Sequence, residues 1–156
     1  MSNSKYFTML VGLPGSGKTT YKLANCQNYV SISTDDFIDV MSKITGKTYN
    51  ELFALHIKAA NAHLIENLAE AIQEGKNIVW DQTNLTKKKR MSVLDRIPRD
   101  YVKTCVFFTI PEDVLVNRRA GRDGKTIPKG ILDNMRSAYE LPSPSEGFDY
   151  IMEITE

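Results

Sequence analysis

The sequence of 156 residues has few cysteines and no long apolar run, and both absences exclude whole classes of protein. Its two cysteines, Cys26 and Cys105, lie far apart without C-x-x-C spacing, so we expect neither a disulfide framework nor a cysteine metal site. No stretch approaches the run of about 18 apolar residues that a membrane span requires, and the first five residues lack the apolar core of a signal peptide. We therefore expect one cytoplasmic domain over residues 1–156, without membrane association.

The net charge is only +1, but the charged residues are unevenly distributed along the chain. Residues 87–136 carry 13 Lys and Arg against 6 Asp and Glu, whereas residues 137–156 carry five acidic residues and no Lys or Arg. An anion-binding surface is therefore expected in the segment 87–136. The run Lys87–Arg90 stands near the start of an expected helix, where positive charge is mildly unfavourable. This position fits contact with a nucleic-acid backbone, and it fits a solvated basic face equally well.

Residues 12–19 match the phosphate-binding motif G-x-x-x-x-G-K-[ST] completely. The motif follows the apolar run Tyr6–Val11 and precedes a helical pattern over Lys18–Cys26, which is the context in which its backbone N–H groups and helix N-terminus bind phosphates. We expect Lys18 to reach the β- and γ-phosphates of a nucleoside triphosphate and the Thr19 hydroxyl to bind Mg²⁺. The residues expected to contact the nucleotide are Gly12, Pro14, Gly15, Ser16, Gly17, Lys18, Thr19 and Thr20.

The chain alternates between short apolar segments and helical patterns. Strands are expected at Tyr6–Val11, Tyr29–Ser33, Asn77–Trp80, Tyr101–Ile110 and Tyr150–Ile154. Helices are expected at Lys18–Cys26, Phe37–Ser42, Tyr49–Glu74, Thr86–Ile97, from Pro111 onward, and at Lys129–Tyr139, with a linker over Leu141–Gly147. The alternation predicts an α/β fold of the P-loop NTPase type, with a mostly parallel central sheet of four to five strands and helices on both faces.

Two aspartates follow expected strands, at the sheet edge where parallel α/β folds bind ligands. Phosphoryl transfer to a hydroxyl needs a carboxylate that accepts the proton, and Asp35 is the best candidate for this base. A helix N-cap is the alternative role for Asp35 and Asp36. Asp81 is similar to a Walker B carboxylate, which binds the metal or a metal-bound water. Gln82 follows it, where ATP-hydrolysing machines usually carry a Glu to polarise water, and this difference favours a kinase.

A cluster of cations late in the sequence predicts a small lid. Arg118 and Arg122 are four residues apart, so on a helix they share one face. Gly121 and Gly124 would let this segment close over the phosphates, where the guanidinium groups would neutralise developing charge. Cations at the solvated C-terminal end of a helix are the alternative.

The combined motifs resemble the kinase module of phage-type polynucleotide kinases over nearly the whole chain. The similarity lies in residues 12–19, Thr34-Asp35-Asp36, Asp81-Gln82-Thr83-Asn84-Leu85 and Arg118-x-x-x-Arg122 with Ile127-Pro128. The resemblance implies ATP and Mg²⁺ as cofactors and nucleic acid, either DNA or RNA, as the acceptor. It implies these roles: Asp35 as general base, Lys18 and Thr19 on the donor phosphates and Mg²⁺, Arg118 and Arg122 as lid arginines, and Asp81 on the metal or acceptor side.

One position departs from that family. An arginine usually follows the base by three residues and grips the acceptor's neighbouring phosphate, but this position is Ile38. The phosphatase domain often fused to such kinases is also missing, so we expect a stand-alone enzyme, in the host cytoplasm if a phage encodes it.

Four functions remain open on the sequence alone. The leading one is a 5′-hydroxyl polynucleotide kinase. The loss of the arginine would suit a phage DNA-modification kinase that phosphorylates the hydroxymethyl group of a modified pyrimidine such as 5-hydroxymethyluracil, a target that base flipping would expose. A small-metabolite kinase and a nucleotide-binding regulatory module complete the set. Asp35 and the lid argue against the regulatory module, and the basic segment favours a polyanionic acceptor.

Overall fold

The centre of the fold is a five-stranded sheet with strand order β2-β3-β1-β4-β5, in which every neighbouring pair is parallel. The computed structural model describes residues 4–121 and 127–156. The strands are β1 (Lys5–Val11), β2 (Val30–Ile32), β3 (Ile78–Asp81), β4 (Tyr101–Phe108) and β5 (Tyr150–Ile154). The predicted α/β fold with a parallel sheet is confirmed, and β5 is the edge strand that the sequence indicates.

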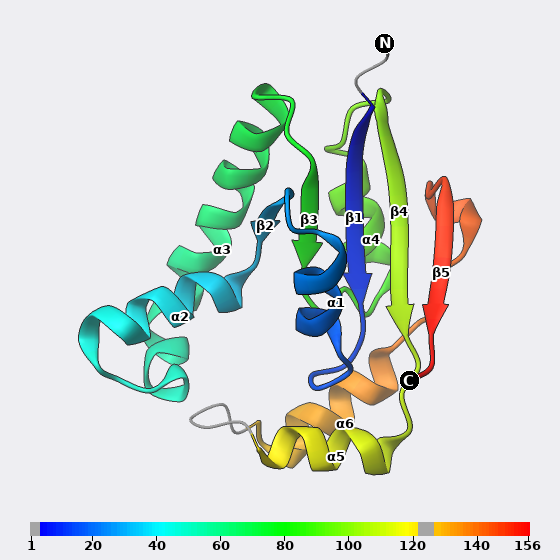
Figure 1. Ribbon diagram of the computed structural model, residues 1–156. Helices are drawn as coiled ribbons and strands as arrows, with labels where there is room; N and C mark the ends of the chain where they lie inside the picture. The colour runs from blue at the N-terminus through cyan, green and yellow to red at the C-terminus, as the bar shows by residue number, and fades with distance from the viewer. Residues whose placement is uncertain (1–3, 122–126) are drawn as a thin grey trace.

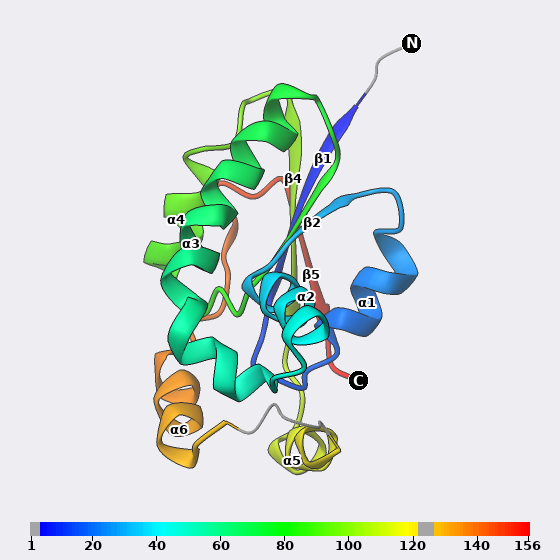
Figure 2. The same ribbon diagram turned by 90° about the vertical axis from the view of Figure 1, so that its left-hand side faces the viewer.

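Helices lie around this sheet. Their bounds are α1 (Lys18–Asn25), α2 (Thr34–Thr45), α3 (Tyr49–Gln73), α4 (Lys87–Leu94), α5 (Glu112–Ala120) and α6 (Lys129–Ala138), with a short 3₁₀ helix η1 (Pro144–Glu146). Figure 2 shows α3 and α4 on one face of the sheet and α1 on the other. In Figure 1, α5 and α6 lie beyond the carboxyl ends of the strands, where the phosphate-binding loop also lies. No helix in the described ranges has the length and apolar composition needed to cross a membrane.

The two faces of β1 bury different sets of apolar side chains. Phe7 and Met9 belong to the core beneath α3, together with Leu68 of that helix. Leu10 belongs to the smaller core on the opposite face, which includes Cys26 just after α1. Burial on both faces is the arrangement expected for a parallel sheet. This packing holds β1 in place and so positions the loop that follows it.

Several expected boundaries differ from those of the structure, and three of the differences bear on the site or its surroundings. Helix α2 begins at Thr34, not at Phe37, and so includes Asp35 in its first turn, where a carboxylate is stabilised by the helix dipole. Asp81 is the last residue of β3 and does not follow it. The expected linker Leu141–Gly147 contains η1, whose capping box joins Ser143 and Glu146. In each case a tertiary or capping contact extends order beyond the apolar pattern.

Cys105 gives a direct test of the core on the α3 side. Its thiol is fully buried in β4, and burial raises its pKa to about 12; burial also raises the pKa of the Cys26 thiol. Because only the thiolate reacts quickly, we expect both cysteines to react slowly with a disulfide reagent at pH 8 in the folded protein and rapidly in urea. Rapid labelling of Cys105 in the folded protein, located by mass spectrometry, would contradict this burial.

Candidate active site

The phosphate-binding loop has the backbone conformation that its glycines allow. Gly15 and Gly17 have φ angles of +83° and +104°, in the left-handed region that favours glycine. Gly17 is also the N-cap residue of α1, so the amino end of this helix opens directly onto the loop. The helix N-terminus and the loop N–H groups therefore form one anion-binding concavity, as the motif predicts.

Two loop side chains fit a bound phosphate chain. The Lys18 ammonium folds over the loop and donates to the carbonyl oxygens of Gly12 at 2.8 Å and Leu13 at 3.1 Å. The Ser16 hydroxyl is buried and has no hydrogen-bond partner among the residues that the structure describes. A buried polar atom of this kind calls for a ligand or water oxygen, so the loop interior suits a polyphosphate.

Gly12 is required for close approach inside the loop. A Cβ atom at this position would stand 2.7 Å from the Ser16 Oγ and 3.1 Å from the Phe108 Cβ. We expect Gly12→Ala to weaken ATP binding by about tenfold, since overpacking of this kind costs roughly 1–3 kcal/mol. Ser16→Ala serves as the matched single variant. The double variant Gly12→Ala/Ser16→Ala should lose less affinity than the sum of the two single losses, because it removes the clashing hydroxyl. Equal affinities of Gly12→Ala and wild type in an ATP titration would contradict this packing.

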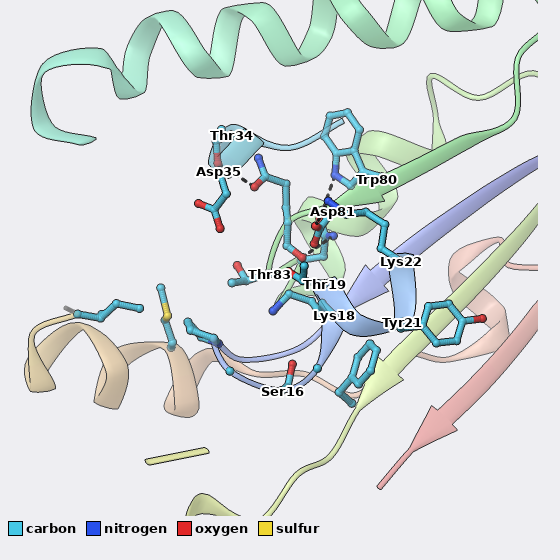
Figure 3. A pocket seen from close by; sticks show the side chains of 18 of the residues that line it. Ser16, Lys18, Thr19, Tyr21, Lys22, Thr34, Asp35, Trp80, Asp81 and Thr83 are labelled. Atoms are coloured by element: carbon cyan, nitrogen blue, oxygen red, sulfur yellow. Dashed lines mark hydrogen bonds and ion pairs between the residues drawn. The ribbon is translucent and has the colours of Figure 1, made fainter. Parts of the chain in front are cut away.

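A cleft of about 1860 Å³ lies above the loop and collects most of the predicted site residues. Its lining includes Lys18, Thr19, Asp35, Asp81 and Arg118. In Figure 3 the Asp35 side chain extends from the start of α2 toward the space above Lys18 and Thr83. The donor loop and the candidate base therefore face one another across a single cleft.

Asp81 is held by a cation that the sequence reasoning missed. The Lys22 ammonium lies 2.9 Å from Asp81 Oδ2 and also donates to the Ser31 hydroxyl at 3.0 Å. Both members of the ion pair are nearly buried, with side-chain exposures of 12% and 10%. Lys22 stands four residues after Lys18, on the same face of α1, and this spacing was the available signal.

The residues near Asp81 fit a magnesium ion. Mg²⁺ is commonly held by one or two carboxylates together with substrate phosphates. Thr19 and Asp81 both line the cleft beside the loop, and Lys22 is bonded to Asp81 through one carboxylate oxygen, Oδ2. A hydroxyl, one carboxylate oxygen and phosphate oxygens form a suitable donor set for Mg²⁺.

The segment after β3 joins the loop to α2. The Thr34 hydroxyl donates to the Gln82 side-chain oxygen at 3.0 Å, and the Gly12 N–H donates to the Thr83 carbonyl at 3.0 Å. Asn84 has a φ angle of 52°, and its amide donates to the Leu10 carbonyl at 2.7 Å. These bonds fix the helix that carries Asp35 relative to the entrance of the loop.

Two neighbouring arginines of α5 contact the loop carbonyls. Arg118 donates to Gly15 O at 3.3 Å, and Arg119 donates to Pro14 O at 3.1 Å. Arg119 also pairs with Glu112 at 2.9 Å, so it serves to attach α5 to the loop, a role that the sequence reasoning missed. Arg118 also lines the cleft. Arg122, the second predicted lid arginine, lies outside the described residues.

Ile38 and Arg90 are both buried, which their neighbours in the sequence do not indicate. Ile38 is fully buried and packs with Leu52 and Ala60 between α2 and α3, so this position does not face the cleft. Arg90, the last residue of the basic run, is also fully buried, and its Nε donates to Glu146 at 2.7 Å. The interpretation of Arg90 as part of a nucleic-acid-binding face was therefore wrong, whereas Lys87, Lys88 and Lys89 are exposed.

Comparison with known proteins assigns the family. The sequence profile described as an AAA domain matches residues 7–142, which include the loop, Asp35, Asp81 and Arg118. The chain belongs to this AAA-domain family. A curated relative, transcription factor bHLH140 of Arabidopsis thaliana, is 24% identical over 152 residues and 92% of this chain. The chain spans only 15% of the length of that relative.

Solved structures share the fold of this AAA-domain protein. A chain of the Pnkp1/Rnl/Hen1 RNA repair complex superimposes with a TM-score of 0.70 at 19% identity, covering 88% of this chain and 45% of that one. A sugar kinase from Janibacter sp. HTCC2649 superimposes with a TM-score of 0.64 at 17% identity, covering 97% of this chain and 85% of the other. At these identities the similarity establishes the P-loop kinase fold, and the acceptor must be inferred from the residues of the cleft.

Proposed function

We propose that the protein is an ATP-dependent kinase that transfers the γ-phosphate to a hydroxyl of a nucleic acid, with the 5′-hydroxyl end of DNA or RNA as the leading acceptor. The observation that carries this proposal is the position of Asp35, which faces the phosphate-binding loop across the cleft. A carboxylate placed there can accept the proton of an attacking hydroxyl. A module that only binds nucleotide has no need of such a group.

The loop side of the cleft serves the donor. Bound ATP would supply the phosphoryl group, and Mg²⁺ would neutralise part of the charge on the phosphates. Lys18 would leave its two loop carbonyls to contact the phosphates, and Thr19 with Asp81 would hold the metal. Arg118 would contact the same phosphates from α5. Arg122 is proposed as its partner from the sequence alone.

The acceptor hydroxyl oxygen forms the new bond to the γ-phosphorus while the bond to the β–γ bridging oxygen breaks. Asp35 takes the hydroxyl proton, and ADP leaves. Gln82 stands where a hydrolase would carry a water-activating Glu, and its side-chain oxygen accepts a hydrogen bond from Thr34. Gln82 therefore positions the start of α2 and does not activate water. This role favours phosphate transfer over hydrolysis of ATP.

A nucleic-acid acceptor is supported by exposed lysines on α4, two of which line the cleft. The similarity in fold to a chain of an RNA repair complex agrees with it. The buried Ile38 specifically favours the second candidate, a kinase for the hydroxymethyl group of a modified pyrimidine in DNA, because the end-binding arginine is missing. The similarity to a sugar kinase supports a third, a small-metabolite kinase.

The proposal is tested with ATP labelled at the γ-phosphate and a panel of acceptors. The panel contains 5′-hydroxyl oligonucleotides, duplexes with internal 5-hydroxymethyluracil, free nucleosides and simple sugars, and Lys18→Met measures the background. Label at 5′ ends is the expected result. Label on internal bases selects the second candidate, and label on sugars or nucleosides without label at 5′ ends selects the third. Release of labelled inorganic phosphate alone would contradict a kinase.

A further inference from the structure

The wall of the cleft opposite the loop is one stripe of α3. Asn50, Phe53, Ala54, Ile57 and Asn61 line the cleft, and their spacing of three and four residues places them on one helical face. Other residues of α3, including Leu64 and Leu68, pack against the sheet. Leu64 and Leu68 continue the same stripe, so one face of α3 lines the cleft in its first half and covers the core in its second half.

The composition of this stripe suits a flat ring. Phe53 is 41% exposed although it is a large aromatic residue, and Ile57 follows it one turn later. Asn50 and Asn61 stand at the two ends of the stripe. An aromatic ring offers a face on which a nucleobase can stack, and side-chain amides can hydrogen-bond to its edge.

Helix α4 adds positive charge to the same cleft. Thr86, Lys88, Lys89 and Ser92 line the cleft, and both lysines are exposed. The other described basic side chains in the lining are Lys18, Lys22 and Arg118, which contact the loop or Asp81. Lys88 and Lys89 thus supply positive charge on an element separate from the donor loop.

The α3 stripe and the α4 lysines can bind an acceptor although position 38 carries no arginine. Ile38 is fully buried against Leu52 and Ala60, so a phosphate of the acceptor cannot be bound from that position. Lys88 and Lys89 face the cleft from a different helix and can neutralise a phosphate. In Figure 3, Asp35 and Trp80 lie between α3 and the loop, so an acceptor resting on α3 can present its hydroxyl to Asp35.

We propose that α3 and α4 together form an acceptor subsite for the terminal nucleotide of a single strand. Its base stacks on Phe53 and Ile57, its 5′-hydroxyl meets Asp35, and its 3′-phosphate meets Lys88 and Lys89. This inference rests on the proposed kinase function and specifies its substrate as a nucleotide that carries both a base and a 3′-phosphate.

Phe53→Ala tests the base contact in the full chain. Transfer is measured to a 5′-hydroxyl oligonucleotide and to the same oligonucleotide with an abasic 5′-terminal residue. We expect the variant to raise the KM of the intact strand by about tenfold, the loss typical of one stacked base, and to leave the KM of the abasic strand unchanged. Leu55→Ala is the matched control, because Leu55 is on the same helix and exposed but does not line the cleft. Equal effects of Phe53→Ala on both strands would overturn the stacking role.

Lys88→Gln/Lys89→Gln tests the phosphate contact. Transfer is measured to a nucleoside 3′-monophosphate and to the corresponding nucleoside. We expect about a tenfold rise in KM for the monophosphate, the effect of losing charge-assisted contacts, with no change for the nucleoside. Lys87→Gln is the control, since Lys87 is exposed on α4 outside the cleft lining. An equal change for both acceptors would overturn the phosphate contact.

Different results would overturn the acceptor subsite and the kinase function. A wild-type protein that labels 5′ ends, with variants that do not discriminate between the paired acceptors, overturns the subsite and leaves the kinase function standing. A wild-type protein that labels only sugars or releases only inorganic phosphate overturns the nucleic-acid kinase and the subsite with it.

Discussion

Asp35→Asn is expected to lower kcat for phosphate transfer by about 10²–10⁴-fold, the usual contribution of a general base, with little change in the KM for ATP. Asn has the shape of Asp but cannot accept the hydroxyl proton. Asp35 is the second residue of α2 and lines the cleft opposite the loop that holds the donor. The substitution therefore removes proton acceptance and leaves the donor site intact. Steady-state transfer of labelled phosphate, with ATP and acceptor varied separately, measures both constants.

The chain offers a matched control for this substitution. Asp113 is the second residue of α5, as Asp35 is of α2, but it is exposed and does not line the cleft. Asp113→Asn removes the same charge from the same helical position and should leave kcat unchanged. Retention of wild-type kcat by Asp35→Asn would show that another group, or the solvent, takes the proton.

Arg90→Met is expected to destabilise the protein by about 3–5 kcal/mol, because it leaves a buried carboxylate without its partner. Arg90 is fully buried and pairs with Glu146 through Nε at 2.7 Å and Nη2 at 3.2 Å. Its Nη1 donates to the Asn84 carbonyl at 2.9 Å. The substitution therefore also loosens the segment that holds the loop entrance. Urea unfolding followed by circular dichroism measures the free energy of unfolding.

A double variant separates the ion pair from simple packing. Arg90→Met/Glu146→Gln removes both charges, and we expect it to be more stable than Arg90→Met alone, since the uncompensated charge is gone. Arg96→Met is the surface control, because Arg96 is exposed just after α4. A loss of less than about 0.5 kcal/mol for Arg90→Met, typical of surface substitutions, would contradict a buried pair.

The parts of the fold that the sequence predicted depend on local patterns. The loop at residues 12–19 and the turn at Gly75, which has a φ angle of +68° after α3, are determined by the backbone needs of a few consecutive residues. The parallel sheet follows from the alternation of strands and helices. Because carboxyl ends of parallel strands share one edge, the sequence also anticipated that Asp35 and Asp81 would face the loop.

The contacts that the sequence did not predict join distant residues. Arg90 and Glu146 are 56 positions apart, and Lys22 and Asp81 are 59 apart. Lys22, Arg90 and Glu146 look like ordinary surface charges in their local context. Only the packing of α4 against η1, or of α1 against the sheet, brings the partners together. Ile38 was seen as a departure from a family pattern, but its burial between α2 and α3 required the structure.

The most direct test of the kinase function compares two versions of one oligonucleotide, with a free 5′-hydroxyl and with a 5′-deoxy end that lacks the acceptor oxygen. Both are incubated with the protein, Mg²⁺ and ATP labelled at the γ-phosphate, and the label is located after digestion to nucleotides. We predict label at the 5′ position of the first strand and none on the second, with release of ADP in equal amount. Label on neither strand, with inorganic phosphate formed at the same rate in both reactions, would contradict phosphate transfer to a nucleic-acid end.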